Sequence, residues 1–525
     1  MLFSKLLSRS GQFSIDFSKL PEIEITGIES DSRKIKPGDM FIALEGGLID
    51  GHAYISEAIA KGAVAVVGRK PVGELKVSYI QTENPRKTLA YLAAAINGNP
   101  ARELTMIGVT GTDGKTTTVN LIYNILLACG FKAGMISTVN AVIGNEIIDT
   151  GFHVTTPDAI IIQQLLRKML DQGFTHVVLE TTSHALDQSR VDACEFDIAV
   201  VTNITHEHLD YHGNYEGYFK AKFKLLDELV NTSAKSFGNP RLAVLNQDDI
   251  SFPKIQEQLV DDRYASITAV DYGISDNASI NAQNISAQLD GLNFDVKLFG
   301  HLYRVASPLV GSFNIYNILA AISTTVIGMK LDIDCVLEGI SSMAGVPGRM
   351  ERITLNQDFL AIVDFAHTPN ALKVALQTAR QLTSGQVLAV FGSAGLRDRE
   401  KRRLMAAESL RRADMTILTA EDPRTENLSA ILKEMTDEAD RNGGILGKNY
   451  LIVEDRGDAI RKAVILAKKG DVVIACGKGH EQSMCFGDTE YLWDDRTAMR
   501  AALAERLGVK GPQMPWLPTR EMKNR

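Results

Sequence analysis

The sequence lacks the features that mark secreted, membrane-spanning and nucleic-acid-binding proteins. Only five of its 525 residues are cysteines, and none has the C-x-x-C spacing of a metal or redox motif. No run of about 18 apolar residues is present, and the opening MLFSKLLSRSGQF has no apolar core of signal-peptide length. The net charge of −8 argues against a nucleic-acid surface. We therefore expect a cytoplasmic protein with no membrane segment, no nucleic-acid partner and reduced thiols at Cys129, Cys194, Cys335, Cys476 and Cys485.

The length and the order of strand-like and helix-like segments predict an α/β protein of three domains. Residues 1–102 form a small α/β domain, which ends at the turn-rich stretch 97–100. Residues 103–344 form a central domain with a mostly parallel sheet. Residues 345–525 form a Rossmann-like domain, which a Pro- and Gly-containing hinge precedes at 345–348.

Residues 105–120 (TMIGVTGTDGKTTTVN) predict a strand, a glycine loop and a helix in immediate succession. Loop glycines let backbone N–H groups turn toward an anion, and a helix N-terminus adds partial positive charge. Lys115 is expected to bridge the outer phosphates, and the Thr116 hydroxyl to bind Mg²⁺. The general nucleotide loop has its first glycine where Val109 stands, so only the core G-x-x-G-K-T fits. The candidate ATP-binding residues of this loop are Gly111, Thr112, Asp113, Gly114, Lys115, Thr116 and Thr117.

Polar residues end two of the strands expected in the same segment, at 176–180 and 198–203. Ligands of parallel sheets gather at the carboxyl ends of strands, where Glu180 and Asn203 are placed. A nucleotide enzyme has a Mg²⁺ ligand or a water-orienting base at such a position. Glu180 is therefore a candidate for either role.

A histidine-rich stretch supports a competing hypothesis from another class. His206, His208, Asp210 and His212 follow the pattern H-x-H-x-D-x-H, and alternating histidine and aspartate bind zinc in metallo-hydrolases. Those hydrolases have a histidine directly after the aspartate, whereas Tyr211 intervenes here. A Mg²⁺ site that uses one of these histidines beside the nucleotide agrees better with the glycine loop.

Two further spacings identify candidate side chains. Lys220 and Lys224 share one face of the helix expected at 218–226, and Lys222 points elsewhere, toward whatever that helix packs on. Asn314 and Asn317 lie three residues apart, on one helical face. Two amides at that spacing can contact an adenine edge or cap the helix.

Loops that follow the expected strands of the third segment combine arginines with acidic residues. Arginine binds a carboxylate in bidentate geometry, and a carboxylate binds an ammonium group, so these loops suit a zwitterionic ligand. The candidate residues are Arg397, Glu421, Asp422, Pro423, Arg424, Gly477 and Glu481.

Taken in order, these motifs resemble the Mur ligases, and within them the MurE-type branch that forms UDP-N-acetylmuramoyl-tripeptide. The motifs are DSRKIKPGDMFIAL at 31–44, GVTGTDGKTTT at 108–118, TTPD at 155–158, ETTSHALDQSRV at 180–191, TNITHEHLDYHG at 202–213, GSFNIYN at 311–317, GRMER at 348–352, VDFAHTPNAL at 363–372, EDPRTEN at 421–427 and GKGHEQ at 477–482. The family also uses the short G-x-x-G-K-[ST] loop, so Val109 is no departure from its pattern.

The resemblance implies a uridine-nucleotide domain, an ATPase domain and a domain that brings the amino acid. It assigns Glu180, His208 and Lys222 to magnesium, with Lys222 as a carbamate, and Arg349 to phosphate. Asn314, Asn317 and Asp364 match ATP contacts. The positions matching contacts to the UDP-linked substrate are Ser32, Thr155, Thr156, Thr182, Gln188 and Arg190.

The implied reaction is amide ligation through an acyl phosphate, catalysed by Lys115, Glu180, His208, Lys222 and Arg349. Its partners are UDP-N-acetylmuramoyl-L-alanyl-D-glutamate, ATP and a diamino acid, with Mg²⁺ as cofactor, and the protein is expected to be a monomer. Arg397 and Arg424 match the pocket of ligases that add meso-2,6-diaminopimelate. The usual D-N-P-R loop reads E-D-P-R here, and the extra charge of Asp422 keeps L-lysine and L-ornithine as alternatives.

Overall fold

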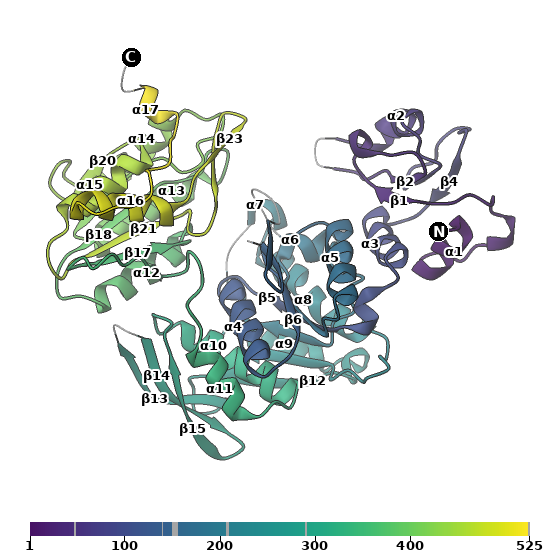
Figure 1. Cartoon of the computed structure of the whole chain (residues 1–525), viewed down its shortest axis with the longest axis horizontal. Helices are drawn as coiled ribbons and strands as arrows, with labels where there is room; N and C mark the ends of the chain where they lie inside the picture. Colours follow the sequence, from purple (N-terminus) through teal and green to yellow (C-terminus); the bar gives the residue numbers. More distant parts are fainter. Residues whose placement is uncertain (47–48, 139, 150–155, 206–208, 289–290, 523–525) are drawn as a thin grey trace. The chain divides into compact units, whose positions relative to one another are not determined.

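Figure 1 shows a computed structural model of the chain, which describes every residue except 47–48, 139, 150–155, 206–208, 289–290 and 523–525. It divides into two compact units. The first comprises Met1–Asn281 and Tyr316–Gly339, and the second comprises Ala282–Ile315 and Ile340–Arg525. The three-domain division expected from the sequence stays a prediction. Among the described residues, no helix is both long enough and apolar enough to cross a membrane.

The first unit begins with a small parallel sheet of order β1-β2-β3-β4. Its strands are short and its central residues fully buried, which places the core between the sheet and its helices. Asn84 caps the helix that leads out of this part, and Pro85 occupies its first turn, where no backbone donor is needed. The elements are α1 (Phe3–Ser10), β1 (Gly27–Glu29), β2 (Asp39–Ile42), α2 (Ile55–Ala60), β3 (Ala65–Gly68), β4 (Ser78–Gln81) and α3 (Pro85–Ile96).

The central sheet has the order β13-β12-β11-β10-β5-β9-β6-β7-β8, parallel from β13 to β6 and antiparallel beyond. Its strands are β5 (Thr105–Thr110), β6 (Ala133–Ile136), β7 (Asn140–Ile143), β8 (Glu146–Asp149), β9 (His176–Glu180), β10 (Ile198–Val201), β11 (Leu242–Asn246), β12 (Thr268–Gly273) and β13 (Ile280–Gln288). The parallel arrangement with helices on both faces confirms the α/β prediction.

Alternate residues of the central strands face opposite layers of helices, as the period of two in a strand requires. Met106, Val177 and Leu179 belong to a core that includes residues of α5, α6, α8 and α9. The phosphate-loop helix α4 packs on β5, β6 and β9 instead. The helices are α4 (Lys115–Ala128), α5 (Ala159–Asp171), α6 (Ser183–Asp187), α7 (Leu209–His212), α8 (Tyr215–Asn231), α9 (Phe252–Leu259), α10 (Asn314–Ile322) and α11 (Ile333–Ser341).

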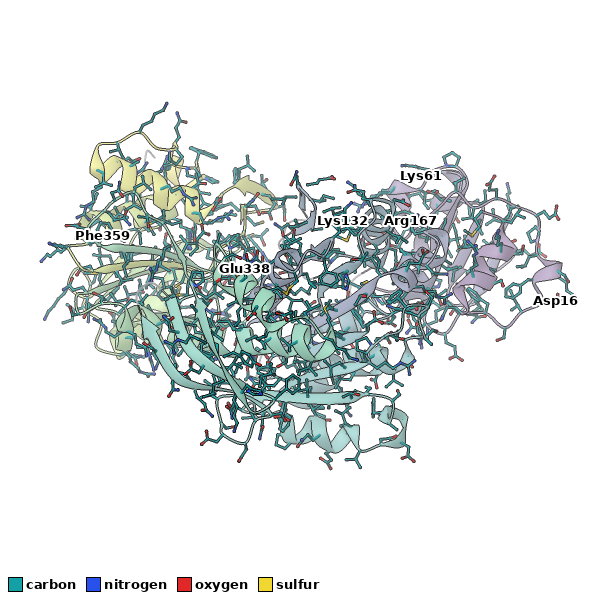
Figure 2. The ribbon with its side chains drawn as sticks, turned by 60° about the horizontal axis from the view of Figure 1, so that its bottom comes forward. Asp16, Lys61, Lys132, Arg167, Glu338 and Phe359 are labelled. Atoms are coloured by element: carbon teal, nitrogen blue, oxygen red, sulfur yellow. A yellow bond between two sulfur atoms is a disulfide. The ribbon has the colours of Figure 1, made fainter. Side chains whose placement is uncertain are left out.

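The cysteine prediction is wrong for one pair. Cys129, which follows the last turn of α4, forms a disulfide with Cys335 of α11, and the two Cα atoms lie 5.2 Å apart (Figure 2). The prediction followed from the expected cytoplasmic location, which does not indicate whether two cysteines 206 positions apart lie close together in the fold. The described helices bring them together: Asn124 donates to the Gly339 carbonyl, and a Cβ at Gly339 would lie 2.6 Å from the Ile125 Cα. Cys194, Cys476 and Cys485 are free and buried.

The second unit contains a six-stranded sheet of order β16-β17-β21-β18-β19-β20, parallel except for β16. Ala361 and Val363 of β17 face a core formed with α15 and α16, and Ile362 between them faces a core formed with α12, α13 and α14. This arrangement is a doubly wound sheet, as the sequence predicted.

Four strands of this unit, β17, β18, β19 and β21, lie within one residue of the strands that the sequence predicts at 361–364, 386–391, 415–418 and 471–476. The strands are β14 (Gly291–Leu298), β15 (His301–Ser307), β16 (Glu351–Arg352), β17 (Leu360–Asp364), β18 (Val387–Phe391), β19 (Met415–Leu418), β20 (Tyr450–Ile452), β21 (Val472–Cys476), β22 (Ser483–Phe486) and β23 (Thr489–Leu492). The helices are α12 (Pro369–Gln381), α13 (Arg399–Arg412), α14 (Leu428–Arg441), α15 (Arg456–Leu466), α16 (Asp495–Leu507) and α17 (Thr519–Met522).

Candidate active site

The glycine loop connects β5 to α4 with no room for side chains at its two glycines. Gly111 has a φ of 153°, and a Cβ there would lie 1.8 Å from the Thr202 hydroxyl oxygen. Gly114 has a φ of 83°, and a Cβ there would lie 2.2 Å from Oδ1 of Asn317. No side chain caps α4, which begins directly after Gly114. The N-terminus of α4 therefore has the geometry of an anion-binding loop.

Two of the side chains expected to bind the metal, those of Thr116 and Glu180, meet at this loop. The Thr116 hydroxyl donates to the Glu180 carboxylate at 3.0 and 3.2 Å, and Glu180 is 2% exposed. Lys115 Nζ donates to the Thr112 carbonyl at 2.7 Å. A hydroxyl and a carboxylate are hard oxygen donors, so this pair fits a magnesium ion better than a zinc ion.

Lys222 is buried at 1% exposure, although it belongs to a run of three lysines. Its Nζ donates to the Gly111 carbonyl at 2.6 Å and lies 4.6 Å from the centre of the Tyr218 ring. Lys220 of the same helix is exposed. The prediction that Lys222 points away from its neighbours, into the protein, is confirmed.

Two residues at the end of β10 hold the glycine loop in place. Asn203 accepts from the Asp113 N–H at 2.9 Å and donates to the Asp113 carbonyl at 3.0 Å. The Thr202 hydroxyl donates to the same carbonyl at 2.7 Å, and the Thr112 N–H donates to the Asn203 carbonyl at 2.8 Å. Sequence reasoning placed Asn203 at the strand end but assigned it no part in the loop, because the contact joins residues 90 positions apart.

Four of the residues matched to the UDP-linked substrate form one cluster beside Glu180. The Thr156 hydroxyl donates to the Glu180 carbonyl at 2.7 Å and accepts from the Thr182 N–H at 3.1 Å. Arg190 donates to the Thr156 carbonyl at 2.8 Å and to the Gln188 side chain at 2.7 Å. Burial lowers the pKa of Arg190 from its ordinary value. Thr182 also caps α6 by accepting from the Ala185 N–H.

Ser32, expected at the uridine nucleotide, lies in the small N-terminal sheet region and is buried. The cap of its short helical turn is Asp31, which accepts from the Arg33 N–H at 3.0 Å. The Arg33 guanidinium pairs with the same carboxylate and lowers the pKa of Asp31 to about 2. Arg33 is therefore engaged by Asp31.

In the second unit, Asp364 organises the end of β17. Its carboxylate accepts from the Met350 N–H at 2.7 Å and from the Ala366 N–H at 2.8 Å. The guanidinium of Arg349 lies 4.4 Å from the centre of the Phe365 ring, and the ring of His480 stacks on Phe365 at 4.7 Å. Arg349 directly precedes Met350, so it lies beside the residue whose N–H the Asp364 carboxylate binds.

The amino-acid candidates gather at the carboxyl ends of β19 and β21. Glu421 is 5% exposed, and burial raises the pKa of its carboxyl group to about 7. Its Oε2 makes no hydrogen bond to the described part of the chain. A Cβ at Gly477 would lie 2.2 Å from that oxygen, so only glycine fits beside it. Pro423 precedes Arg424, which is half-buried, and Arg397 is exposed on the neighbouring loop.

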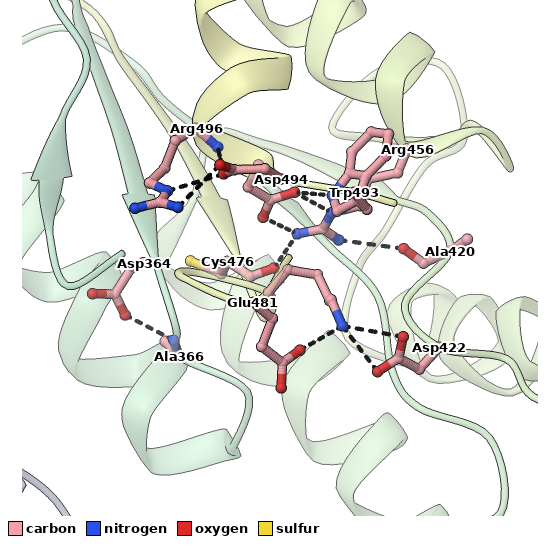
Figure 3. A network of polar contacts seen from close by, with 12 residues as sticks. Asp364, Ala366, Ala420, Asp422, Arg456, Cys476, Glu481, Trp493, Asp494 and Arg496 are labelled. Atoms are coloured by element: carbon pink, nitrogen blue, oxygen red, sulfur yellow. Dashed lines mark hydrogen bonds and ion pairs between the residues drawn. The ribbon is translucent and has the colours of Figure 1, made fainter. Parts of the chain in front are cut away.

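Lys478 is a functional candidate that the sequence reasoning missed. Its buried Nζ lies between two candidate acids, 3.0 Å from Asp422 and in contact with Glu481 (Figure 3). Asp422 also accepts from the Cys485 N–H at 2.9 Å. The idea that Asp422 offers its charge to a second substrate ammonium is corrected, because Lys478 already pairs with that charge.

Several of the expected site residues cannot be placed in these clusters or outside them. Thr155, His206 and His208 lie outside the described residues, as does the side chain of Asp210. The ring of His212 lies 5.5 Å from that of His184.

Asn314 and Asn317 fall in different units. Asn317 accepts from the Thr118 hydroxyl at 3.3 Å, and Asn314 donates to the Val310 carbonyl at 2.8 Å.

Among the described side chains, one cluster has the spacing of a metal site: Glu45, Asp50 and His52. Lys70 pairs with both acids of this cluster, and Asp50 and two backbone N–H groups occupy the His52 ring nitrogens. The cluster is therefore an ion-paired network.

The first unit has a phosphate loop on a parallel sheet with a buried acid beside the loop, and the second unit has a doubly wound sheet. These features define a nucleotide-binding α/β protein of several parts. Three family models match this chain along its length. They are "Mur ligase family, catalytic domain" over residues 24–97, "Mur ligase middle domain" over 109–325 and "Mur ligase, glutamate ligase domain" over 348–479. The chain belongs to the Mur ligase family.

Curated relatives are similar over nearly the whole chain. A "UDP-N-acetylmuramoyl-L-alanyl-D-glutamate--2,6-diaminopimelate ligase" of Bacillus cereus is 39% identical, covering 94% of this chain and 97% of the relative. A "UDP-N-acetylmuramyl-tripeptide synthetase" of Roseiflexus sp. strain RS-1 is 41% identical, with 93% and 96% covered. A solved structure titled as a 2,6-diaminopimelate ligase of the same kind has a TM-score of 0.67 at 29% identity, covering 97% of this chain and all of that one.

Proposed function

We propose that this protein is an ATP-dependent, ADP-forming ligase that adds meso-2,6-diaminopimelate to UDP-N-acetylmuramoyl-L-alanyl-D-glutamate, in the synthesis of peptidoglycan precursors. The observation that carries the proposal is the glycine loop with Thr116 and Glu180 in contact and Lys222 buried against Gly111. Relatives whose names state this reaction support it.

ATP binds at the glycine loop in this proposal. The N–H groups at the start of α4 and the ammonium group of Lys115 neutralise the phosphates. Asn317 adjoins the loop, and we assign it with Asn314 to the adenine side, Arg349 to a phosphate and Asp364 to the ribose. Thr116, Glu180 and His208 would hold magnesium, which would supply positive charge to neutralise the phosphates.

Lys222 is assigned to the same metal as a carbamate. Carbamylation would convert the amine into an anionic oxygen donor, the ligand type that magnesium prefers. The position of its Nζ, 2.6 Å from the loop carbonyl of Gly111, supports a role at the phosphates. A ¹³CO₂-labelled carbamate signal that is lost in a Lys222→Ala variant tests this assignment by nuclear magnetic resonance.

The protein's chemical task is activation, because a carboxylate and an amine do not condense spontaneously in water. The D-glutamate side-chain carboxylate attacks the γ-phosphate, which gives an acyl phosphate and ADP. The amine of the amino acid then attacks the acyl carbon, and phosphate leaves. Positioning of the two substrates and neutralisation of phosphate charge by Lys115 and Arg349 supply the catalysis.

The UDP-linked substrate is assigned to the cluster beside Glu180. Thr156, Thr182, Gln188 and Arg190 present hydroxyl, amide and guanidinium groups there, which suit the carboxylates and amides of a muramoyl dipeptide. Thr155 is assigned to the same substrate, and Ser32 to its uridine diphosphate.

Diaminopimelate is preferred over L-lysine and L-ornithine on charge grounds. Arg397 and Arg424 provide guanidinium groups for carboxylates, and only diaminopimelate has a second carboxylate at its distal end. Since Lys478 pairs with Asp422, that acid does not bias the pocket toward a bare ammonium group. Glu481 also pairs with Lys478, so Glu421, whose Oε2 makes no hydrogen bond to the described part of the chain, is left for the distal ammonium. Gly477 and Glu481 are assigned to the same pocket. A pocket built for a charged group rejects its absence strongly.

The test is phosphate release from ATP with the UDP-linked dipeptide and one diamino acid at a time. We expect diaminopimelate to stimulate release and lysine and ornithine to stimulate it far less. No stimulation by any of the three would overturn the ligase proposal, and stimulation by lysine alone would overturn the specificity. We also propose a cytoplasmic monomer, and light scattering after size-exclusion chromatography tests the oligomeric state.

A further inference from the structure

An ion pair between the buried Arg402 and the partly exposed Glu426 contacts the two loops that contain Arg397 and Arg424. The side chain of Arg402, on α13, is 0% exposed and binds the Glu426 carboxylate in bidentate geometry at 2.6 and 2.7 Å. Arg402 also donates to the Ala394 carbonyl at 3.3 Å. One guanidinium group thus contacts both loops, since Ala394 belongs to the first and Glu426 to the second.

Glu426 also contacts the first loop directly. It accepts from the Leu396 N–H at 2.9 Å, next to Arg397 in the chain. The Gly395 N–H donates to the Asp422 carbonyl at 2.9 Å, which joins the loops again. Hydrogen bonds to Arg402 are the main cause that lowers the pKa of Glu426 to about 2, so the pair is ionised at neutral pH.

Three residues of these two loops have an unfavourable backbone conformation, which hydrogen bonds from neighbouring side chains can hold in place. Leu396, Asp422 and Arg424 have φ values of 56°, 39° and 54°, a left-handed conformation that residues with a side chain rarely adopt. Residues held in such conformations persist when the surrounding contacts over-determine them, and they cluster at ligand sites. Glu426 accepts directly from the N–H of Leu396, and Glu426 itself lies two positions after Arg424 in the chain.

We propose that Glu426 and Arg402 are positioning residues for amino-acid recognition: they fix the two loops so that Arg397 and Arg424 are held at the spacing of the substrate's carboxylates. The proposal rests on the proposed function. Neither residue contacts the substrate itself. Both act through the loops, so their loss should change amino-acid binding and leave the other two substrates alone.

The experiment compares Glu426→Gln with wild type in the phosphate-release assay. The amide keeps the size of the side chain but removes the charge that binds Arg402 in bidentate geometry, and leaves Arg402 its single contact with the Glu434 carboxylate at 3.2 Å. We expect the KM for diaminopimelate to rise about tenfold or more, since small displacements of positioning groups have large effects. The KM values for ATP and the UDP-linked dipeptide should stay within about twofold. The preference for diaminopimelate over lysine should shrink, because misplaced arginines no longer select the second carboxylate.

The matched control is Glu505→Gln, because Glu505 and Arg461 form another bidentate pair in the same unit, at 2.6 and 2.9 Å, that joins α15 to α16. This variant should change no KM. If Glu426→Gln does not fold, Arg402→Lys, which keeps the charge but cannot reach both loops, is judged by the same criterion.

Three results distinguish the explanations. An unchanged KM for diaminopimelate in the folded variant overturns the inference, and so does an equal rise of all three KM values, which a merely structural role would give. A wild-type enzyme that diaminopimelate does not stimulate overturns the proposed function instead.

Discussion

The Cys129–Cys335 disulfide should contribute strongly to the stability of the first unit. It joins residues 206 positions apart, and both belong to that unit. The loop-entropy relation gives about 18 cal/mol/K for a closed loop of about 200 residues, or about 5 kcal/mol at 25 °C. Measured values usually fall below this relation, so we expect a loss of about 2–5 kcal/mol on reduction or in a Cys335→Ser variant.

The two tryptophans make the measurement selective. Trp493 and Trp516 are the only ones in the chain, and both lie in the second unit. Urea unfolding followed by tryptophan fluorescence therefore reports the second unit, whereas far-ultraviolet circular dichroism reports both. We expect Cys335→Ser to move the dichroism transition to lower urea and to leave the fluorescence transition in place.

Thiol counting provides the control. Without reductant, the denatured protein should expose the three free thiols, and after reduction it should expose all five. Five thiols before reduction would show that the bond does not form. A dichroism transition that does not move between oxidised wild type and Cys335→Ser would refute the stability argument.

Three other perturbations test the site and the second unit. Lys115→Ala should reduce phosphate release at saturating substrates by about a hundredfold or more, because it removes a charge that the phosphates require. Burial raises the pKa of the Glu421 carboxyl group from 4.5 to about 7. Between these two pH values the native protein keeps a proton on Glu421 that the unfolded chain has lost. The free energy of unfolding should therefore fall by about 3 kcal/mol as the pH rises from 4.5 to about 7. Fluorescence-monitored urea unfolding at several pH values should show this slope in wild type and a flatter profile in Glu421→Gln. Arg456→Met should destabilise the second unit by about 3–5 kcal/mol in the same assay, because it leaves the fully buried Asp495 without its ion-pair partner (Figure 3). An unchanged urea midpoint of the fluorescence transition would contradict this expectation.

The parts of the fold that local sequence determines were predictable. The strand at His176–Glu180 begins and ends where expected, because it is a buried run bounded by polar residues. The direction of Lys222 followed from helical periodicity alone. The helix predicted after the glycine loop is α4, which starts at Lys115.

The contacts that depend on distant residues were not predictable. Thr202 and Asn203 hold the loop from another strand, and Lys478 reaches Asp422 across 56 positions. Strands β7, β8, β14 and β15, which form antiparallel pairs, were also missed, because the alternation of strands and helices indicates only the parallel part of a sheet. None of these pairings leaves a local period or spacing in the sequence.

The register of the central sheet explains why the loop does without the first glycine of the general nucleotide motif. Val109, which stands at that position, is a fully buried residue of β5 and pairs directly with Glu180 of β9. A strand that continues through Val109 keeps Glu180 in register beside the loop, where its carboxylate accepts from Thr116. The turn toward the phosphate starts only at Gly111, where a Cβ would collide with Thr202. A glycine at position 109 would gain no turn and would lose a packed core residue, so the short loop and the position of the acid depend on one another.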